Sequence, residues 1–203
     1  MRAVYTIGHS THSITAFVEL LKRADISAIA DVRSTPYSRR SPQFNQEALR
    51  KFLEDCHIAY VFLGAELGGR GNPDSEHDEY GRIKYRSIAE SALFRDGLHR
   101  VQTGSTRMRL ALMCAERDPL DCHRGILISR ILVAQGTPVT HIHADGHLEP
   151  HDIAESRLLR LFDLHEADLY WTEDQVLAEA YERQEARIAY IAPNYSTREE
   201  TVG

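Results

Sequence analysis

The sequence of 203 residues has few cysteines, only three, and it lacks any stretch of about 18 consecutive apolar residues. The second absence argues against a transmembrane helix, and the apolar run in MRAVYTIGHS is too short for a signal peptide. An odd, low number of cysteines does not suit a disulfide framework, so we expect free thiols and a cytoplasmic protein. Apolar residues make up 42% of the chain, which is enough for a sizeable core.

The net charge of −6 is distributed unevenly along the chain. Residues 145–203 hold 14 acidic side chains against five arginines, so residues 1–144 carry a net charge of +3. Residues 22–51 hold seven basic side chains against three acidic ones. A basic front is compatible with a phosphate-bearing substrate, and a solvated surface with an acidic terminal helix is the simpler alternative.

Short β-prone runs alternate with helix-like apolar patterns along the sequence. We expect strands at 3–7, 26–32, 58–63, 108–114 and 137–144, and helices at 13–24, 45–56, 83–101, 123–136, 151–163 and 173–188. This alternation predicts an α/β fold with a mainly parallel sheet of about five strands and helices on both faces. We expect one α/β domain over residues 1–165. An acidic helical extension over 166–203 would pack on it or trail from it.

Reactive residue types follow each expected strand. The residues at these ends are Gly8, His9, Ser10, Asp31, Arg33, Glu66, Gly68, Gly69, Arg70, Cys114, Glu116, His141 and His143. Because open parallel sheets bind ligands beyond the carboxyl ends of their strands, we expect these residues to share a cleft. Loops are polar in any protein, so the argument depends on the number of His, Arg, Cys and Glu side chains.

The segment DVRSTPYSRRSPQF, residues 31–44, is the densest cationic loop of the chain. Its cations are Arg33, Arg39 and Arg40, and its aromatic residues are Tyr37 and Phe44. Guanidinium groups suit phosphate or carboxylate, and aromatic rings suit the stacking of a base. The alternative is that Asp31 or Glu66 pairs with some of these arginines and fastens the loop.

The segment YTIGHSTHS, residues 5–13, places Gly8 at a turn from a strand to a helix. Free backbone N–H groups at such a turn favour an anion, and His9 is suited to general acid–base catalysis. The segment matches neither the dinucleotide nor the mononucleotide glycine pattern, so an ordinary turn with an incidental His9 remains the alternative.

The segment LALMCAERDPLDCHRGILISRIL, residues 110–132, contains two cysteines. Cys122 lies near an expected helix N-terminus beside His123 and Arg124, and all three influences lower a thiol pKa. A reactive thiolate is therefore physically reasonable, but a phosphatase-type loop is not, because no arginine follows either cysteine at that motif's spacing.

Metal binding by the same segment is a weaker interpretation. Its Cys and His residues lack the paired short spacing of structural zinc sites, so no metal and no other cofactor is assigned from the sequence. Cys114 is expected to be part of the core. Glu116, at the end of a strand, is the better candidate for a general base or for the stabilisation of a cation.

The segment THIHADGHLEPH, residues 140–151, is rich in histidine. His141, His143 and His147 invite a metal-binding interpretation. No carboxylate stands at a clear ligand spacing, and Asp145-Gly146 is typical of a turn, so this interpretation is not adopted.

Four motifs together resemble a prokaryotic family known as domain of unknown function 488. They are TIGHS, DVRSTPYSR with the later Phe, LGAELGGR and MCAERDPLDCHR, and the resemblance runs from about residue 4 to residue 150. Members of the family are often labelled as DNA-repair-related, but the family implies no settled activity. The motif positions that it implies are Gly8, His9, Ser10, Asp31, Arg33, Pro36, Ser38, Phe44, Leu67, Gly68, Gly69, Glu116, Cys122, His123 and Arg124.

The leading functional expectation is a hydrolytic enzyme that acts on a nucleic acid or nucleotide, with an N-glycosidic bond as one candidate target. The residues expected to bind phosphate or substrate are Gly8, Ser10, Arg33, Tyr37, Arg39, Arg40, Phe44, Gly68, Gly69, His123 and Arg124. Glu116 or Asp31 would activate water or stabilise an oxocarbenium-like centre, with His9 assisting proton transfer. The negative net charge counts against tight DNA binding.

Two alternatives remain open from the sequence. One is a thiol-dependent enzyme that uses Cys122 on a small phosphorylated or sulfur-bearing substrate. The other is a non-catalytic module that binds a nucleotide.

Overall fold

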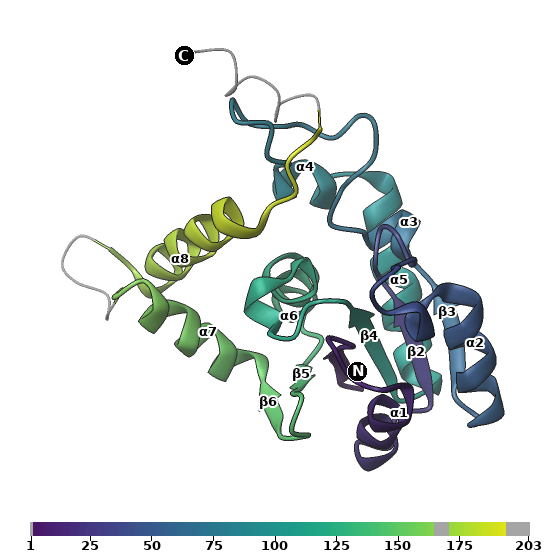
Figure 1. Cartoon of the computed structure of the whole chain (residues 1–203). Coiled ribbons are helices and arrows are strands. Elements are labelled where there is room, and N and C mark those ends of the chain that lie inside the picture. Colours follow the sequence, from purple (N-terminus) through teal and green to yellow (C-terminus); the bar gives the residue numbers. More distant parts are fainter. Residues whose placement is uncertain (1, 165–170, 194–203) are drawn as a thin grey trace.

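A six-stranded sheet forms the centre of the protein (Figure 1). The computed structural model describes residues 2–164 and 171–193. The strands lie in the order β3-β2-β4-β1-β5-β6. Their bounds are Val4–Gly8 for β1, Ala28–Asp31 for β2, Ala59–Phe62 for β3, Leu110–Cys114 for β4, Val139–Ile142 for β5 and Leu148–Pro150 for β6. The first five strands run parallel, and β6 pairs antiparallel with β5. The predicted α/β fold with a mainly parallel sheet is therefore confirmed.

Helices cover both faces of the sheet. Helices α1 (Ile14–Arg23) and α2 (Gln46–Asp55) pack on one face, where Phe17 and Leu49 join a buried cluster with Ile29 of β2. Helices α5 (Ala92–Arg107), α6 (Arg130–Ala134), α7 (His151–Leu161) and α8 (Glu173–Ile188) belong to a second cluster on the other face. Burial of alternate strand residues in two clusters explains why the strands are almost continuously apolar.

The starts of the first two helices depend on different hydrogen bonds. Ser13 caps α1 as predicted, because its side-chain oxygen accepts a hydrogen bond from the backbone N–H of Ala16 at 3.2 Å. Asn45 precedes α2, but its side chain accepts from the backbone N–H of Ser38 at 2.7 Å instead of capping the helix. Asn45 therefore fastens the cationic loop to the start of α2.

The single helix expected at 83–101 is in fact two helices. The short α4 (Tyr85–Ala89) ends before Ser91, whose side chain caps α5 through the backbone N–H of Phe94 at 3.1 Å. Helix α5 then continues to Arg107, six residues beyond the predicted end. A competing cap inside the apolar pattern explains the break.

The helix expected at 123–136 begins as a π-helix over Arg124–Ser129, here η3, before α6 continues it. The hydroxyl of Ser129 donates to the carbonyl oxygen of Arg124 at 2.6 Å, which supports this wider turn. Such π-helical turns are frequent at functional sites.

The C-terminal helices add to the second face of the sheet. Helices α7 and α8 lie side by side beyond β6 (Figure 1), and Leu158 and Tyr181 share the same buried cluster. A capping box between Thr172 and Gln175 begins α8. The expected extension over 166–203 lies partly outside the described residues, but its described part packs against the core.

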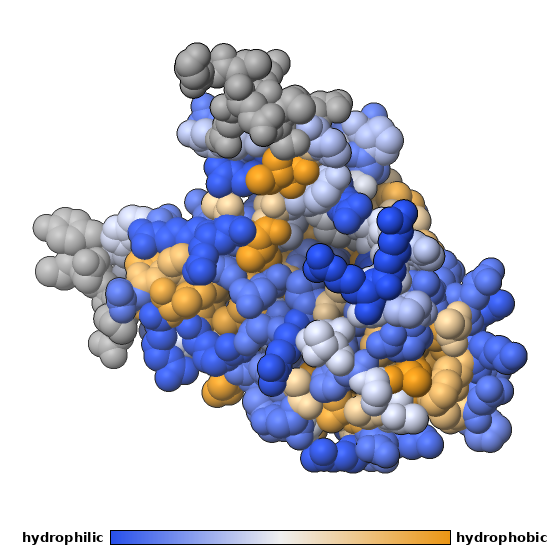
Figure 2. Space-filling view, in the orientation of Figure 1, coloured by the Kyte–Doolittle hydropathy of each residue, from blue (hydrophilic) through white to orange (hydrophobic). Residues whose placement is uncertain are grey.

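The exposed face drawn in Figure 2 is mainly hydrophilic, with small separate hydrophobic groups. Helices of the described chain are neither long nor apolar enough to span a membrane.

Candidate functional site

A cavity of about 260 Å³ opens at the carboxyl ends of β2 and β4. Loops after both strands contribute to it, as do the loop after helix α3 (Gly64–Leu67), the start of α4 and the end of α8. The lining residues are Arg33, Ser34, Thr35, Gly69, Arg70, Tyr85, Cys114, Ala115, Glu116, Asp121, Cys122, His123, Ile188 and Tyr190. The cleft expected at the carboxyl edge of the sheet is present, but its lining differs from the predicted set.

Two cysteines and one histidine meet in the wall of this cavity. Cys114 ends β4, while Cys122 and His123 directly precede η3. The Nδ1 atom of His123 lies 3.8 Å from Sγ of Cys114 and 3.7 Å from Sγ of Cys122. The loop between β4 and η3 thus folds back and brings together residues eight positions apart in sequence.

The imidazole ring of His123 is held on two sides. Its Nε2 lies 3.1 Å from the carbonyl oxygen of Val32, which accepts hydrogen bonds only, so Nε2 carries a proton. Gly69 covers the ring, since a methyl group at that position would lie 2.7 Å from Cγ of His123. The second glycine of LGGR is therefore required by close packing on His123.

Neighbouring groups shift the pKa values of the two cysteines and the histidine in different directions. Burial alone would raise the pKa of Cys122, but Cys114, Arg124 and His123 hold it well below its usual value. Burial alone would lower the pKa of His123, whereas Cys122 and Glu116 raise it. The neighbouring Cys122 and burial raise the pKa of Cys114, so Cys122 is the more acidic of the two thiols.

Glu116 lies at the exposed side of the cluster. Its Oε2 atom is 3.0 Å from Sγ of Cys122. Loss of hydration and the Cys122 sulfur raise the pKa of this carboxyl group. A carboxylate with a raised pKa, at the edge of a cavity, is suited to proton transfer.

The loop that carries Glu116 is fixed by buried backbone contacts. The guanidinium of Arg124, 1% exposed, donates to the carbonyl oxygens of Glu116 at 2.8 Å and of Arg117 at 2.9 Å. Gly8 packs on the same loop, because a methyl group there would overlap the carbonyl oxygen of Glu116. Arg124 was expected to bind phosphate, but its Nη1 and Nη2 donors are used for positioning the loop.

The turn after β1 does not offer free N–H groups to an anion. The backbone N–H of His9 donates to the carbonyl of Cys114, and that of Ser10 donates to the carbonyl of Ala115, both at 2.9 Å. The expected anion-binding role of Gly8 and Ser10 is therefore replaced by pairing with the loop after β4.

Arg33 lines the cavity, but its guanidinium is already paired. It donates to both carboxylate oxygens of Asp31 and to the carbonyl oxygen of Phe44. Asp31 is fully buried and also accepts from the hydroxyl of Tyr60 at 2.8 Å. The alternative in which Asp31 pairs with an arginine of the cationic loop is thus correct for Arg33, and neither group is free for phosphate or water.

His9 and Phe44 form a buried stack. Their ring centroids lie 4.3 Å apart, and Phe44 is fully buried, so its ring has no face open to a base. Burial, followed by the charge of Arg33, lowers the pKa of His9 to about 4. His9 is therefore neutral near pH 7 and lies behind the cavity instead of lining it.

The remaining residues of the cationic loop face solvent. Tyr37 is 64% exposed, and Arg39 and Arg40 are exposed. None of the three lines the cavity. Gly68, also expected at the site, has a packing role, because a methyl group there would overlap the Gly64 carbonyl oxygen and the Ser34 hydroxyl.

Several residues of the cavity could not be identified from the sequence. Tyr190 follows α8, far from the motifs, yet the guanidinium of Arg70 lies 4.7 Å from the centroid of its ring. Arg70 also donates to the hydroxyl of Thr35 at 3.4 Å. Arg70 and Cys114 stood at expected strand ends, which was the one available signal, whereas nothing in the sequence linked Tyr190 to the site.

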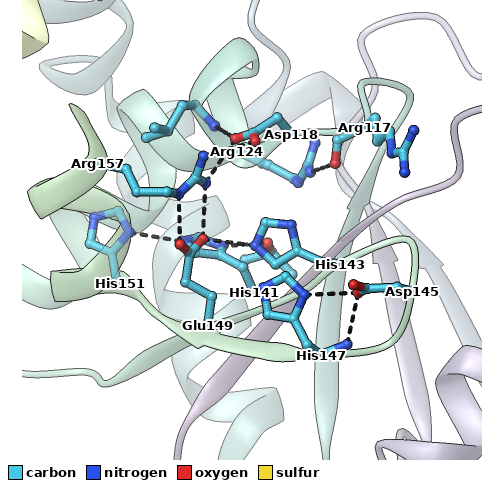
Figure 3. Close-up of polar contacts among 12 residues, drawn as sticks. Arg117, Asp118, Arg124, His141, His143, Asp145, His147, Glu149, His151 and Arg157 are labelled. Atoms are coloured by element: carbon cyan, nitrogen blue, oxygen red, sulfur yellow. Dashed lines mark hydrogen bonds and ion pairs between the residues drawn. The ribbon is translucent and has the colours of Figure 1, made fainter. Parts of the chain in front are cut away.

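The histidines of this segment have different polar partners, although the rings of His143 and His147 stack with their centroids 4.1 Å apart (Figure 3). His143 pairs with Glu149 at 2.7 Å, and His147 pairs with Asp145 at 2.8 Å. His141 lies 2.9 Å from His151, and Arg157 joins Glu149 to Asp118. These partners give the histidines a structural role in the β5–β6 hairpin and in its contact with α7.

The fold and the site define an α/β protein with a cysteine–histidine cavity at the carboxyl edge of its parallel sheet. The chain belongs to the family described as Domain of unknown function DUF488, whose model matches residues 13–131. This range includes the cationic loop, LGGR and the CHR segment, but neither TIGHS nor the pocket residues Ile188 and Tyr190. Neither a curated protein nor a solved structure matches the chain.

Proposed function

We propose that the protein is a hydrolase for a small anionic substrate, such as a nucleotide or another phosphorylated compound, with Glu116 as the general base. One observation carries the proposal. The Glu116 carboxylate and the Cys122–His123 pair share a cavity with Arg70, whose guanidinium has no carboxylate partner among the described residues. An anion held by Arg70 would present a reacting atom to the Glu116 side of the cavity.

The size and lining of the cavity support a small substrate. Its volume of about 260 Å³ is close to the lower end of ligand pockets, roughly 300 to 1,000 Å³. Hydroxyl groups of Ser34 and Thr35 lie beside Arg70, and the ring of Tyr190 adds an aromatic surface. This combination suits one phosphate or nucleotide unit better than a duplex.

The test is a hydrolysis screen of phosphomonoesters, nucleotides and nucleosides with the purified chain. Replacement of a general base costs about 10²- to 10⁴-fold in rate, and we expect a loss of this size in kcat for Glu116→Gln. Arg70→Ala should raise KM for anionic substrates. Glu90→Gln is the matched control, because Glu90 pairs with Arg86 on the surface. Full activity of Glu116→Gln would refute the proposed role.

A second function is favoured by the surroundings of the Cys122 sulfur. The backbone N–H of Arg124 donates to this Sγ at 3.4 Å, and Nδ1 of His123 lies 3.7 Å from it. A thiol-dependent enzyme would use the Cys122 thiolate to displace a leaving group, which takes a proton from His123. Water would then hydrolyse the covalent intermediate and restore the thiol.

The two candidate functions differ in a measurable intermediate. A thiol-dependent reaction predicts a substrate-derived group on Cys122, which mass spectrometry of protein quenched during turnover would detect. Hydrolysis with Glu116 as the base predicts unmodified Cys122 throughout the reaction.

A further inference from the structure

We propose that Cys114, Cys122 and His123 bind one Zn²⁺ ion whose fourth coordination position opens into the cavity. The proposal deepens the proposed function, and it rests on that function only for the role of the metal in hydrolysis. The three ligand atoms lie within 4.8 Å of one another. In the described part of the chain, no other group of His, Cys, Asp and Glu side chains meets in this way.

The spacing of the ligand atoms is close to that of a tetrahedral zinc site. Zn–S bonds of about 2.3 Å and Zn–N bonds of about 2.0 Å at tetrahedral angles separate sulfur and nitrogen by about 3.5 Å. The distances from Nδ1 of His123 to the two sulfurs are 3.8 and 3.7 Å. A metal ion would therefore require only small movements of these side chains.

The orientation of His123 also suits a metal ligand. Its Nε2–H donates to the carbonyl oxygen of Val32, which directs Nδ1 towards both sulfurs. Metal-binding histidines usually donate their other N–H to a carbonyl or carboxylate in this way. Metal binding requires deprotonated thiolates and an unprotonated Nδ1, so a bound cation would displace any protons that these three atoms carry.

The donor set selects the kind of metal. Two thiolates and one imidazole favour Zn²⁺ over Mg²⁺ or Ca²⁺, which prefer oxygen ligands. The backbone N–H of Arg124 at 3.4 Å from Sγ of Cys122 would stabilise a thiolate ligand. The sequence spacing of these residues did not indicate a metal site, because one ligand ends β4 and the other two directly precede η3.

The position of the cluster makes the site an open one. All three ligands line the cavity, so a water molecule or a substrate oxygen can reach the fourth position. Zinc sites with three protein ligands and one open position are typical of catalysis, since the metal activates its bound water. Glu116, with Oε2 3.0 Å from Sγ of Cys122, is placed to accept a proton from such a water.

The test is a titration of the reduced, metal-free full chain with Co²⁺, followed by displacement with Zn²⁺. Tetrahedral Co²⁺ bound by thiolates gives intense visible bands and a thiolate-to-cobalt charge-transfer band in the near ultraviolet. We expect these bands to saturate at one equivalent and to disappear when one equivalent of Zn²⁺ is added. Bands that never form, or that lack the charge-transfer component, would overturn the proposal.

Variants assign the ligands. Cys114→Ser and Cys122→Ser should each weaken the charge-transfer band, whereas Cys56→Ser should leave it unchanged, because Cys56 lies after α2 and outside the cavity. An equal loss in Cys56→Ser would show adventitious thiolate binding and contradict the assignment. Circular dichroism of each variant identifies a loss that is caused by unfolding, and the wild-type titration tests the site without any variant.

Glu116→Gln separates this inference from the proposed function. It should keep the cobalt spectrum and lose hydrolysis, because Glu116 is placed beside the open position and is not one of the three ligands. Loss of the cobalt bands in Glu116→Gln would overturn the open three-ligand site. A wild-type protein with the bands but no hydrolysis supports the metal site and removes the proposed function. Hydrolysis that a chelator does not inhibit, in a protein that gives no cobalt bands, would support the proposed function and overturn the metal site.

Discussion

The backbone of Gly69 lies directly against the imidazole ring of His123, and a methyl group at position 69 would lie 2.7 Å from Cγ of that ring. Because the other edge of the ring is held by the carbonyl oxygen of Val32, His123 has little room to move away. The second glycine of LGGR and the histidine of CHR, more than fifty positions apart, therefore form one packed unit at the cavity.

We predict that Gly69→Ala displaces the His123 ring. Overpacking of this kind costs about 1 to 3 kcal/mol in the free energy of unfolding, and the ring should turn Nδ1 away from the two sulfurs. Denaturant unfolding and the cobalt charge-transfer band measure the two effects. Gly104→Ala is the control, because its methyl group would meet only Leu110 at 3.8 Å. A Gly69→Ala protein with an unchanged band would show that the contact does not position His123.

The buried ion pair between Asp31 and Arg33 gives a second prediction. Asp31 is fully buried and accepts hydrogen bonds from Arg33 and from Tyr60. We expect Asp31→Ala to destabilise the protein by about 3 to 5 kcal/mol, since it leaves a buried guanidinium without its partner. Urea denaturation at pH 7 measures this change.

The control for Asp31 is Glu90, which pairs with Arg86 at 2.8 Å and is 65% exposed. Glu90→Ala should cost no more than about 1 kcal/mol, because exposed ion pairs contribute little. If Asp31→Ala retained wild-type stability but lost hydrolysis, Asp31 would instead have the catalytic role that the sequence suggested.

Buried histidines give a prediction for pH. Burial lowers the pKa values of both His9 and His151 to about 4, below the ordinary value of 6.5. His151 Nε2–H donates to Tyr181, whose hydroxyl donates to Glu155, so its Nδ1 accepts from His141 Nε2. A proton added to Nδ1 of His151 would face the N–H of His141 and remove the hydrogen bond between the two rings.

At His9 and His151 the unfolded chain therefore binds more protons than the folded chain between about pH 4 and 6.5. Stability is fully present above this window and is lost as the pH falls through it, by about 2 kcal/mol per histidine between pH 7 and pH 5. The free energy of unfolding at a series of pH values should show this slope. His151→Gln should reduce the slope, whereas His99→Gln, at an exposed position of α5, should not.

Much of the fold follows from apolar patterns that are local in sequence. The five parallel strands and α1, α2, α7 and α8 lie within a few residues of their predicted positions, because each has its own pattern or cap. Strand β6 was not predicted, since three residues that end in Pro150 carry no strand pattern. The break at Ser91 and the π-helix η3 depend on single side-chain hydrogen bonds, which an apolar pattern does not reveal.

The candidate site was predictable only in part. Parallel topology predicted that Arg33, Cys114 and Glu116 would meet at one edge of the sheet, and all three line the cavity, whereas His9, expected at the same edge, does not. Residue type alone did not distinguish a free guanidinium from a paired one, so Arg33 and Arg124 were expected to bind phosphate. Their actual partners, a buried carboxylate and backbone carbonyls, depend on the tertiary structure.

The exposed cations of the loop after β2 give the last prediction, which tests the nucleic-acid hypothesis directly. Arg39 and Arg40 face solvent outside the cavity, beside Tyr37, which is 64% exposed. Their guanidinium groups are therefore accessible to a phosphate backbone, and the ring of Tyr37 is accessible to an unpaired base. If a nucleic acid binds here, the double variant Arg39→Ala/Arg40→Ala should weaken its binding.

Fluorescence anisotropy with a labelled single-stranded oligonucleotide, measured at several salt concentrations, gives the required comparison. The slope of log affinity against log salt should fall by up to about one unit for each phosphate that the variant no longer neutralises. Stability should change by less than about 0.5 kcal/mol, as is usual for surface charges. Arg95→Ala/Arg107→Ala removes two exposed charges from α5 and controls for net charge. Equal losses in both double variants would indicate non-specific attraction, and no salt-dependent binding by the wild-type chain would leave the small anionic substrate as the better hypothesis.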